Sequence, residues 1–329
     1  MQSGITDAPY QGSKNDIVPQ PGVDISTNLQ NEMSKPEISS LTARSLKMSP
    51  SRSNAKPALK TCDPAWDRLC EEAEVLCSKE PLMASFVYST ILNHQKLEIA
   101  ICHRLAKRLS HSDVVSGDLF QTFEELLITK PALAEAFRAD LAAVFDRDPA
   151  CNRLIEPILY FKGFHSLQTY RFAHELYNDG RADFAYYLQS QASRVFGVDI
   201  HPAAKIGRGI MFDHATGLVI GETAVVGDDS SILHGVTLGG SGKDADDRHP
   251  KIGRGVMIGA GAKILGNIKV GNCVRVASGS VVLKDVPDMM TVAGVPAKIV
   301  GQAGCQEPAR SMNQLLEASA ITEQDVASD

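Results

Sequence analysis

The 329-residue sequence lacks any run of apolar residues long enough to cross a membrane, because a spanning helix needs roughly 18 or more of them in succession. It also lacks a basic excess: 33 Lys and Arg stand against 39 Asp and Glu, a formal net charge of −6 at pH 7. This balance argues against a nucleic-acid-binding surface. With 43% hydrophobic and 22% charged residues, the chain is an ordinary globular protein long enough for two domains. We therefore expect neither a membrane nor a nucleic acid as partner.

The cysteines lack the paired spacing of a redox or zinc motif. The chain has seven, none of them in a CxxC pair: Cys62, Cys70, Cys77, Cys102, Cys151, Cys273 and Cys305. An odd number without such pairs favours reduced thiols in a reducing compartment over a disulfide framework or a zinc site. We expect a cytoplasmic protein without a bound metal.

Residues 1–60 lack a periodic apolar pattern and are rich in Ser, Pro, Asn, Gln and Lys. This composition predicts a disordered leader. A cleaved organelle-targeting peptide is the alternative, but such peptides are poor in acids. The leader carries acidic residues along much of its length, at Asp7, Asp16, Asp24, Glu32 and Glu37.

Residues 61–197 are expected to form a helical domain. Long Ala- and Leu-rich stretches alternate here with prolines at positions 81, 131, 149 and 157. Asp63-Pro64 is typical of an N-cap followed by proline in the first helical turn. Over residues 81–109, apolar residues recur at spacings of three and four, and basic residues gather at the end, as at a helix C-terminus.

Small aliphatic residues recur six apart from Ile200 to the Asp-Val-Pro sequence at 285–287. Three runs have this period: Ile200, Ile206 and Phe212; Ile220, Val226, Ile232 and Leu238; then Ile252, Ile258, Ile264, Val270, Val276 and Val282. A hexapeptide repeat is a signature of a parallel β-helix, in which each unit makes a short strand and a tight turn and three units close a coil. One coil cannot bury its own apolar face, so the coils must stack.

We expect this β-helix over residues 198–301, with its corners at residues that tolerate positive φ, such as Gly255, Gly261, Asn267 and Gly279. The repeat then stops. Residues 302–329 are expected to form a mobile C-terminal tail with weak helical content around residues 312–320.

The first phase break of the repeat brings an acid and an imidazole into reach of each other. Asp199 and His214 are 15 residues apart, close to one coil of about 18 residues. An Asp that accepts a hydrogen bond from one imidazole nitrogen fixes the tautomer and leaves the other nitrogen as a general base. Taken alone, a histidine on a solenoid is more often a surface or corner residue whose hydrogen bonds are satisfied and which has no catalytic role.

The second break is the insertion GGSGKDADDRHPK between Leu238 and Ile252. Its glycines permit a mobile loop, and it ends on Arg248 and His249, which suit a carboxylate because arginine offers a planar fork for bidentate pairing. The loop does not follow the phosphate-binding GxxxxGK[ST] pattern, and by itself it is equally a connector.

Together these pieces resemble the serine O-acetyltransferase family over about residues 63–301. The resemblance is carried by EPLMASF, RDPAC and YFKGFHSLQTYR in the helical part, and by VDIHPAAKIGRGIMFDHATG, VTLGGSGK, DRHPKIG and VPAKIVG in the repeats. It implies an α+β fold, an all-helical N-terminal domain followed by a left-handed parallel β-helix. It also implies direct acetyl transfer from acetyl-CoA to the L-serine hydroxyl, in cysteine biosynthesis, with acetyl-CoA as co-substrate and no permanently bound cofactor.

The family's functional residues carry over to matching positions. The resemblance implies His214 as the base and Asp199 as its orienting partner, without an acyl-enzyme. The implied serine contacts are Asp148, Asp213, Arg248 and His249, and the implied coenzyme A contacts are Gly240, Lys243, Ala260 and Ser278. The chemistry agrees, since acids suit the ammonium of serine and Arg248 with His249 suits its carboxylate. Asp148 has a plainer alternative role as a helix cap.

The resemblance also implies a homotrimer of β-helices, paired through the helical domains into a hexamer, with active sites between adjacent subunits. L-Cysteine is expected to inhibit by occupying the serine site. Family members that bind O-acetylserine sulfhydrylase insert a C-terminal Ile into its active site, whereas this chain ends in Val326-Ala327-Ser328-Asp329. This departure argues against that complex.

Three other functions fit parts of the pattern. The first is a zinc-dependent lyase like the γ-class carbonic anhydrases, for which His201, His214, His234 and His249 supply imidazoles. The second is a catalytically silent subunit that binds the sulfhydrylase, which the intact Asp199 and His214 disfavour. The third is acetyl transfer to a sugar or an antibiotic, which the helical-domain motifs disfavour.

Overall fold

The computed structural model describes residues 63–242 and 246–316. The predicted leader over residues 1–60, the predicted coenzyme A contact Lys243 and the tail beyond residue 316 lie outside the described residues. Everything below concerns the compact unit that contains the described residues.

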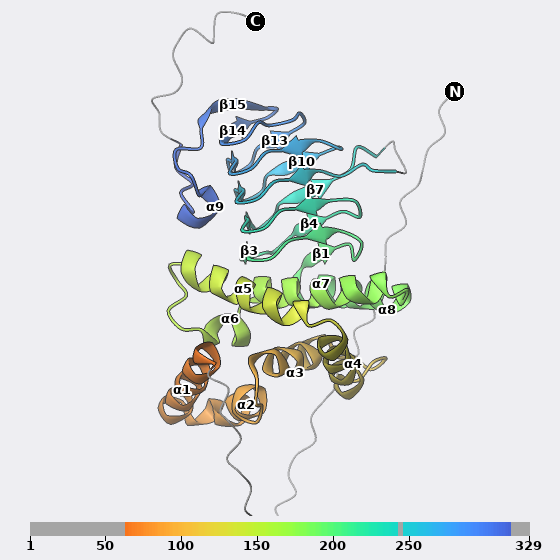
Figure 1. Cartoon of the computed structure of the whole chain (residues 1–329), viewed down its shortest axis with the longest axis vertical. Coiled ribbons are helices and arrows are strands. Elements are labelled where there is room, and N and C mark those ends of the chain that lie inside the picture. Colours follow the sequence, from red (N-terminus) through yellow and green to blue (C-terminus); the bar gives the residue numbers. More distant parts are fainter. Residues whose placement is uncertain (1–62, 243–245, 317–329) are drawn as a thin grey trace, which may run out of the picture. The chain divides into compact units, whose positions relative to one another are not determined.

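The helical region comes first in the chain (Figure 1). Its α-helices are α1 (Pro64–Lys79), α2 (Ala84–Val87), α3 (Leu97–Leu109), α4 (Ser116–Thr129), α5 (Ala132–Arg147), α6 (Ile155–Leu159), α7 (Lys162–Asn178) and α8 (Ala182–Phe196). Helix α1 begins as expected, since Asp63 Oδ1 accepts a hydrogen bond from the Trp66 backbone N–H at 3.2 Å. Within the described ranges, no helix is both long enough and apolar enough to span a bilayer.

The stretch 81–109 is helical but not continuous. It divides into a 3₁₀ turn η1 (Pro81–Met83), α2, a π-helical turn η2 (Tyr88–Leu92) and α3. The break falls on the polar run Asn93-His94-Gln95-Lys96, which offers no apolar side chain to the core, and α3 starts again at the fully buried Leu97. The 3.6-residue pattern on both sides predicts the helices but not this interruption.

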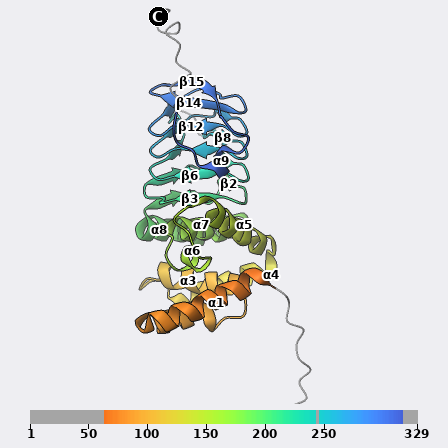
Figure 2. The same cartoon turned by 90° about the vertical axis from the view of Figure 1, so that its left-hand side faces the viewer.

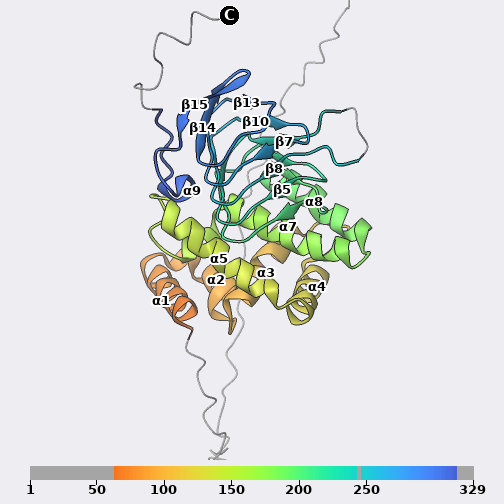
Figure 3. The same cartoon turned by 45° about the horizontal axis from the view of Figure 1, so that its top comes forward.

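The β-helix follows directly. Its strands are β1 (Val198–Ile200), β2 (Lys205–Ile206), β3 (Met211–Asp213), β4 (Leu218–Ile220), β5 (Val225–Val226), β6 (Ser231–Leu233), β7 (Thr237–Gly239), β8 (Lys251–Ile252), β9 (Met257–Ile258), β10 (Lys263–Leu265), β11 (Lys269–Val270), β12 (Arg275–Val276), β13 (Val281–Val282), β14 (Met290–Gly294) and β15 (Ala297–Gln302). They form three sheets, ordered β1-β4-β7-β10-β13, β2-β5-β8-β11 and β3-β6-β9-β12-β14-β15. All pairs are parallel except β14 with β15. Figures 2 and 3 show the coils stacked along a common axis.

Successive residues of each aliphatic run fall in successive sheets, so that the runs together build three columns of aligned side chains, one in each sheet. The columns are Ile200, Ile220, Leu238, Ile264 and Val282 in the first sheet, Ile206, Val226, Ile252 and Val270 in the second, and Phe212, Ile232, Ile258, Val276 and Val292 in the third. All belong to the core except Ile206, which is half-buried against it. The prediction of a helical region followed by a parallel β-helix is therefore confirmed.

The corners differ from the expectation at one position. Gly255, Gly261 and Gly279 have positive φ as predicted, but in the fourth corner the positive φ belongs to Gly266 and not to Asn267. Glycine adopts this backbone region without the steric penalty that a Cβ brings, so of the two adjacent turn residues it is the glycine that occupies it.

A buried ion pair joins the helical region to the first coil. Asp140 on α5 is fully buried, and its carboxylate accepts hydrogen bonds from Arg171 Nε at 2.7 Å, from Gln168 Nε2 at 3.0 Å and from the Ile210 backbone N–H at 3.0 Å. Arg171, on α7, also donates to the Gly207 carbonyl at 2.7 Å. Because all these donors converge on one buried carboxylate, the network holds α5 and α7 against the corner between the second and third sheets.

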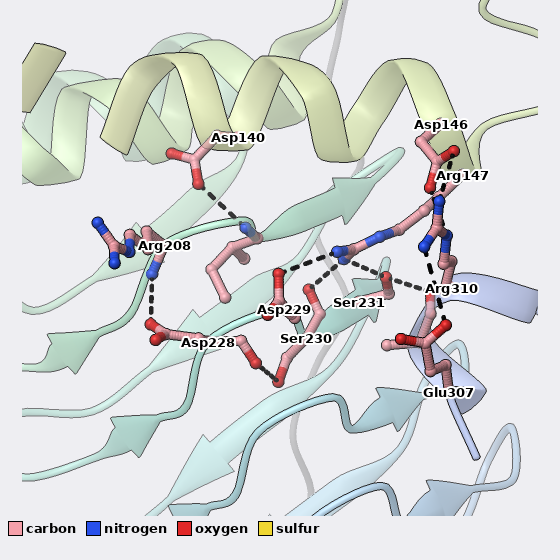
Figure 4. A network of polar contacts seen from close by, with 12 residues as sticks. Asp140, Asp146, Arg147, Arg208, Asp228, Asp229, Ser230, Ser231, Glu307 and Arg310 are labelled. Carbon is pink, nitrogen blue, oxygen red and sulfur yellow. Dashed lines mark hydrogen bonds and ion pairs between the residues drawn. The ribbon is translucent and has the colours of Figure 1, made fainter. Parts of the chain in front are cut away.

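The segment after β15 is packed against the β-helix, although we expected a mobile tail from residue 302. Its short helix α9 (Pro308–Ser311) lies beside α5, and the helix falls before the predicted 312–320. Figure 4 shows the contacts: Arg310 pairs with Asp146 at 2.8 Å, while buried Arg147 donates to Ser231 Oγ at 3.2 Å. Ser231 Oγ in turn donates to the Ala309 carbonyl at 2.8 Å.

Candidate active site

His214 stands at the corner between the third and the first sheet. Backbone hydrogen bonds stack this corner coil on coil: Gly235 N–H donates to the Thr216 carbonyl, Gly261 N–H to the His234 carbonyl and Gly279 N–H to the Ala260 carbonyl, each at 2.8 Å. His214, His234, Ala260 and Ser278 therefore follow one another along a single edge of the β-helix. We call these four residues the histidine edge.

Asp213 lies beside His214, and Asp148 lies near Asp213. Asp213 Oδ1 is 3.7 Å from His214 Nε2, and the His214 side chain is 77% exposed whereas that of Asp213 is 21% exposed. Burial raises the pKa of the Asp213 carboxyl; the His214 imidazole opposes this rise and Asp148 adds to it. The His234 ring stands edge-on to the His214 ring, with centroids 5.9 Å apart. Two neighbouring acids can bind a cationic group, and the exposed imidazole beside them can accept a proton from a hydroxyl of that ligand.

Asp148 is at a helix cap, one of the two roles that its sequence context suggested. It is the C-cap residue of α5, and its Oδ1 accepts a hydrogen bond from the Ala150 backbone N–H at 2.8 Å. This bond holds the turn at Pro149, and the carboxylate remains close enough to Asp213 to influence its protonation. Capping and ligand binding are therefore compatible at this residue.

Asp199 lies apart from His214 in its hydrogen bonding. It is on β1, and its Oδ1 accepts a hydrogen bond from Gln189 Nε2 on α8 at 2.7 Å. Its side chain lines an open cleft of about 460 Å³ against α8. Between these two described side chains there is no hydrogen bond or ion pair, so the pairing of Asp199 with His214 stays a prediction.

Arg248 and His249 lie at the next corner, between the first and the second sheet. With Glu222 and Thr223 they form what we call the arginine edge. Arg248 Nη2 binds Glu222 Oε2 at 2.7 Å, which holds the pKa of the Glu222 carboxyl below its usual range. The planar guanidinium is thus oriented by a carboxylate before any ligand arrives.

Thr223 fixes the tautomer of His249. The Thr223 hydroxyl accepts hydrogen bonds from the backbone N–H groups of Arg248 and His249, both at 3.1 Å, and its oxygen lies 2.9 Å from His249 Nδ1. The Thr223 backbone N–H also faces Nδ1, at 3.2 Å. Nδ1 is therefore the acceptor and Nε2 carries the proton. Burial, then Arg248 and Lys251, lower the pKa of His249, so the ring is a neutral donor at pH 7.

A glycine makes room for this ring. A Cβ at position 221, just after β4, would lie 2.0 Å from His249 Nε2 and 2.1 Å from its Cδ2. The imidazole therefore lies flat across the backbone at this corner. Only glycine at position 221 permits that position.

The predicted coenzyme A contacts divide between the two edges. Ala260 and Ser278 belong to the histidine edge, and Ser278 Oγ donates to Gln314 Oε1 of the C-terminal segment at 3.3 Å. Gly240 lies with the arginine edge, where a Cβ would be 3.1 Å from Arg248 Cγ. In the part of the chain that the structure describes, no hydrogen bond or ion pair links the two edges.

Sequence reasoning missed several members of the two groups. His234 had a usable signal, because Asp213 aligns with Leu233 and so His214 aligns with His234, 20 residues later. Glu222 and Thr223 had none, since they match no motif. For the zinc alternative, no three His, Cys, Asp or Glu side chains within 63–242 and 246–316 converge as a metal site would require.

Two family models match the sequence. Residues 65–169 match the N-terminal domain of serine acetyltransferases, and residues 249–284 match the bacterial transferase hexapeptide model of six repeats. The serine acetyltransferase of Haemophilus influenzae is 52% identical over 249 residues, which are 76% of this chain and 93% of that protein.

Three solved structures of serine acetyltransferases resemble this chain in both sequence and fold. The serine acetyltransferase of Brucella abortus in complex with coenzyme A is 58% identical with a TM-score of 0.73, over 74% of this chain and 98% of that one. A serine acetyltransferase in complex with cysteine is 51% identical with a TM-score of 0.75, over 77% and 98%. The Neisseria gonorrhoeae enzyme in complex with serine is 50% identical with a TM-score of 0.70, over 73% and 98%. The chain therefore belongs to the serine acetyltransferase family of acyltransferases.

Proposed function

We propose that the protein transfers the acetyl group of acetyl-CoA to the hydroxyl of L-serine, giving O-acetylserine and CoA, with His214 as the general base. The observation that carries this proposal is the exposed His214 imidazole beside Asp213, whose carboxyl lies close enough to Asp148 for the two acids to interact. This arrangement suits a substrate that carries an ammonium next to the hydroxyl to be deprotonated. The relatives solved with coenzyme A and with serine support the same pair of substrates.

In the reaction, Asp148 and Asp213 attract the serine ammonium, and the Arg248 guanidinium pairs with the serine carboxylate. His214 removes the hydroxyl proton as the oxygen attacks the thioester carbon. The new C–O bond forms, the C–S bond breaks, and the proton passes from His214 to the departing CoA sulfur. A positioned base typically contributes about 10²- to 10⁴-fold, and holding both substrates in place contributes more.

Asp199 is proposed to orient the base. Gln189 occupies its Oδ1, which leaves Oδ2 to accept a proton-bearing nitrogen of the His214 ring. Such a bond would fix the tautomer and stabilise the imidazolium that forms during attack. Asp199→Asn should therefore lower kcat with little change in the KM for serine.

We propose that the site is completed between two chains. The base lies on the histidine edge with the residues for the ammonium next to it, and those for the carboxylate lie on the arginine edge. In a homotrimer, the histidine edge of one subunit would face the arginine edge of the next, and the trimers would pair through the helical regions into a hexamer.

Mixed oligomers test this arrangement. His214→Ala and Arg248→Ala, each inactive alone, should regain about a quarter of wild-type activity when co-assembled at random, because half of the subunits supply each intact edge. His214→Ala with Asp148→Ala is the control, since both residues lie on one edge and no intact site can form. Equal recovery in both mixtures would contradict the intersubunit site.

L-Cysteine carries the same ammonium and carboxylate as serine, so we propose that it occupies the same contacts and inhibits the enzyme; the relative solved with cysteine supports this.

We also propose that the enzyme is cytoplasmic, since an odd set of cysteines without CxxC spacing suits a reducing compartment.

The experiment that tests the function is thiol release from acetyl-CoA with L-serine, L-homoserine, a sugar or chloramphenicol, each with and without L-cysteine. Release with serine alone, suppressed by cysteine, is the expected result. Release with another acceptor but not with serine would refute the assignment of serine as the substrate.

Arg248→Lys should raise the KM for serine far more than the KM for acetyl-CoA, because lysine cannot pair with a carboxylate in a bidentate manner.

A further inference from the structure

A lysine from the helical region reaches the turn that carries His214. Lys162, the first residue of α7, donates a short hydrogen bond from its Nζ to Thr216 Oγ1. The next residue brings the two elements into direct backbone contact, since a Cβ on Gly163 would lie 2.0 Å from the Phe212 carbonyl oxygen. The start of α7 is thus seated against β3 and the turn after it.

This turn has an unusual backbone. His214 and Ala215 are consecutive non-glycine residues in the left-handed region, with φ of 55° and 57°. Such conformations are disfavoured and persist where the surroundings over-determine them, typically at functional sites. Tight backbone bonds close the turn, from Ala215 N–H to the Asp213 carbonyl at 2.6 Å and from Thr216 N–H to the His214 carbonyl at 2.8 Å.

Side-chain support for the turn is sparse. Considering only the residues that the structure describes, Lys162 is the one side chain outside residues 213–217 that hydrogen-bonds to a side chain of this turn. The His214 ring is itself 77% exposed. Apart from the edge-on His234 ring, its direction depends on the backbone that carries it. That backbone is bonded to the next coil through the Thr216 carbonyl and to α7 through the Thr216 side chain.

We propose that Lys162 is a positioning residue for the reaction: by holding Thr216 from the start of α7, it keeps the left-handed turn, and with it the His214 imidazole, in the reactive orientation. This inference rests on the proposed role of His214 as the base. Lys162 acts through geometry and touches neither substrate. Lys162 is half-buried, but its bond to Thr216 is exposed to solvent. Polar pairs at the surface usually contribute little to stability, so the effect belongs to kcat and not to folding.

The test compares Lys162→Met, Thr216→Val, the double variant and Thr216→Ser, with Lys107→Met as matched control. Lys107 also bonds a hydroxyl, Ser116 Oγ at 3.4 Å, but on the helical surface away from the turn. Lys162→Met and Thr216→Val should each lower kcat by about 10- to 100-fold, because misplacing a reacting group by about 1 Å costs on that order. The KM values and the melting temperature should stay close to those of wild type.

Two results identify the bond itself. The double variant should lose no more than either single variant, because both remove the same interaction. Thr216→Ser, which keeps the hydroxyl, should keep most of the activity, and Lys107→Met all of it.

Three outcomes would overturn the inference: an unchanged kcat in Lys162→Met, additive losses in the double variant, or a rise in the KM for acetyl-CoA alone, which would make Lys162 a contact of a coenzyme phosphate. The proposed base is tested separately. An active His214→Ala would refute the base, whatever the Lys162 variants show, while an inactive His214→Ala with an unaffected Lys162→Met would refute only the positioning role.

Discussion

Replacing Gly221 with Ala should displace His249 and little else. The added Cβ would lie 2.0 Å from His249 Nε2, and its close neighbours are all atoms of that ring. The φ of Gly221 is not in the positive range, so alanine meets no backbone penalty there. The conflict is with the end of one side chain, which can rotate away.

The size of the effect follows from these distances. Non-bonded carbon contacts are comfortable at about 3.5 Å, so the ring must move by about 1.5 Å. It would leave Thr223 Oγ1, now 2.9 Å from Nδ1, at a cost of about 1 kcal/mol in the free energy of unfolding. A lost hydrogen bond to a charged group is worth about 1.5–3 kcal/mol. The kcat/KM for serine should therefore fall by about 10- to 100-fold.

The assay is thiol release at varied serine and varied acetyl-CoA, together with urea unfolding. Gly117→Ala is the matched control, because a Cβ at that position in α4 meets nothing within 4 Å and alanine favours helix. The control should keep wild-type kinetics. If Gly221→Ala kept its kcat/KM for serine, the assignment of His249 to the serine carboxylate would be refuted.

Two further predictions concern stability. Asp140→Ala should lower the free energy of unfolding by about 3–5 kcal/mol because it leaves the buried Arg171 unpaired. The double variant Asp140→Leu with Arg171→Met should recover most of that loss. If urea unfolding gave the same free energy of unfolding for the single and the double variant, the prediction would be contradicted. Burial lowers the pKa of His165 to about 3, so between that pH and the ordinary value near 6.5 the unfolded state binds the extra proton. The free energy of unfolding should therefore fall by about 1.4 kcal/mol for each pH unit below 6.5, and His165→Gln, which can still donate to the Ile158 carbonyl, should remove that slope; an unchanged slope would show that His165 is not the group responsible.

The fold was largely predictable because one physical constraint repeats. Each coil must bury an aliphatic side chain in each sheet, so the period of six in the sequence reappears as aligned columns such as Ile220, Leu238 and Ile264. The helical region was also predictable from its apolar spacing, but details held by single tertiary contacts were not. The break before Leu97 and the packing of α9 depend on tertiary contacts such as the pair of Arg310 with Asp146, which leave no local pattern.

The candidate site residues could be named from motifs, but their arrangement could not. Motifs singled out His214 and Arg248, yet their placement on two separate edges follows from how many residues each turn absorbs. Thr223, which bonds His249, and Lys162, which we propose positions His214, are ordinary polar residues whose roles come from distances across the fold.

The most direct test of the account is the rate of CoA thiol release with L-serine by wild type and by His214→Ala, with the oligomer mass and melting temperature measured on the same samples. The account predicts a loss of at least about 10²-fold in His214→Ala, at unchanged mass and melting temperature. A rate within a few fold of wild type would contradict the assignment of His214 as the base.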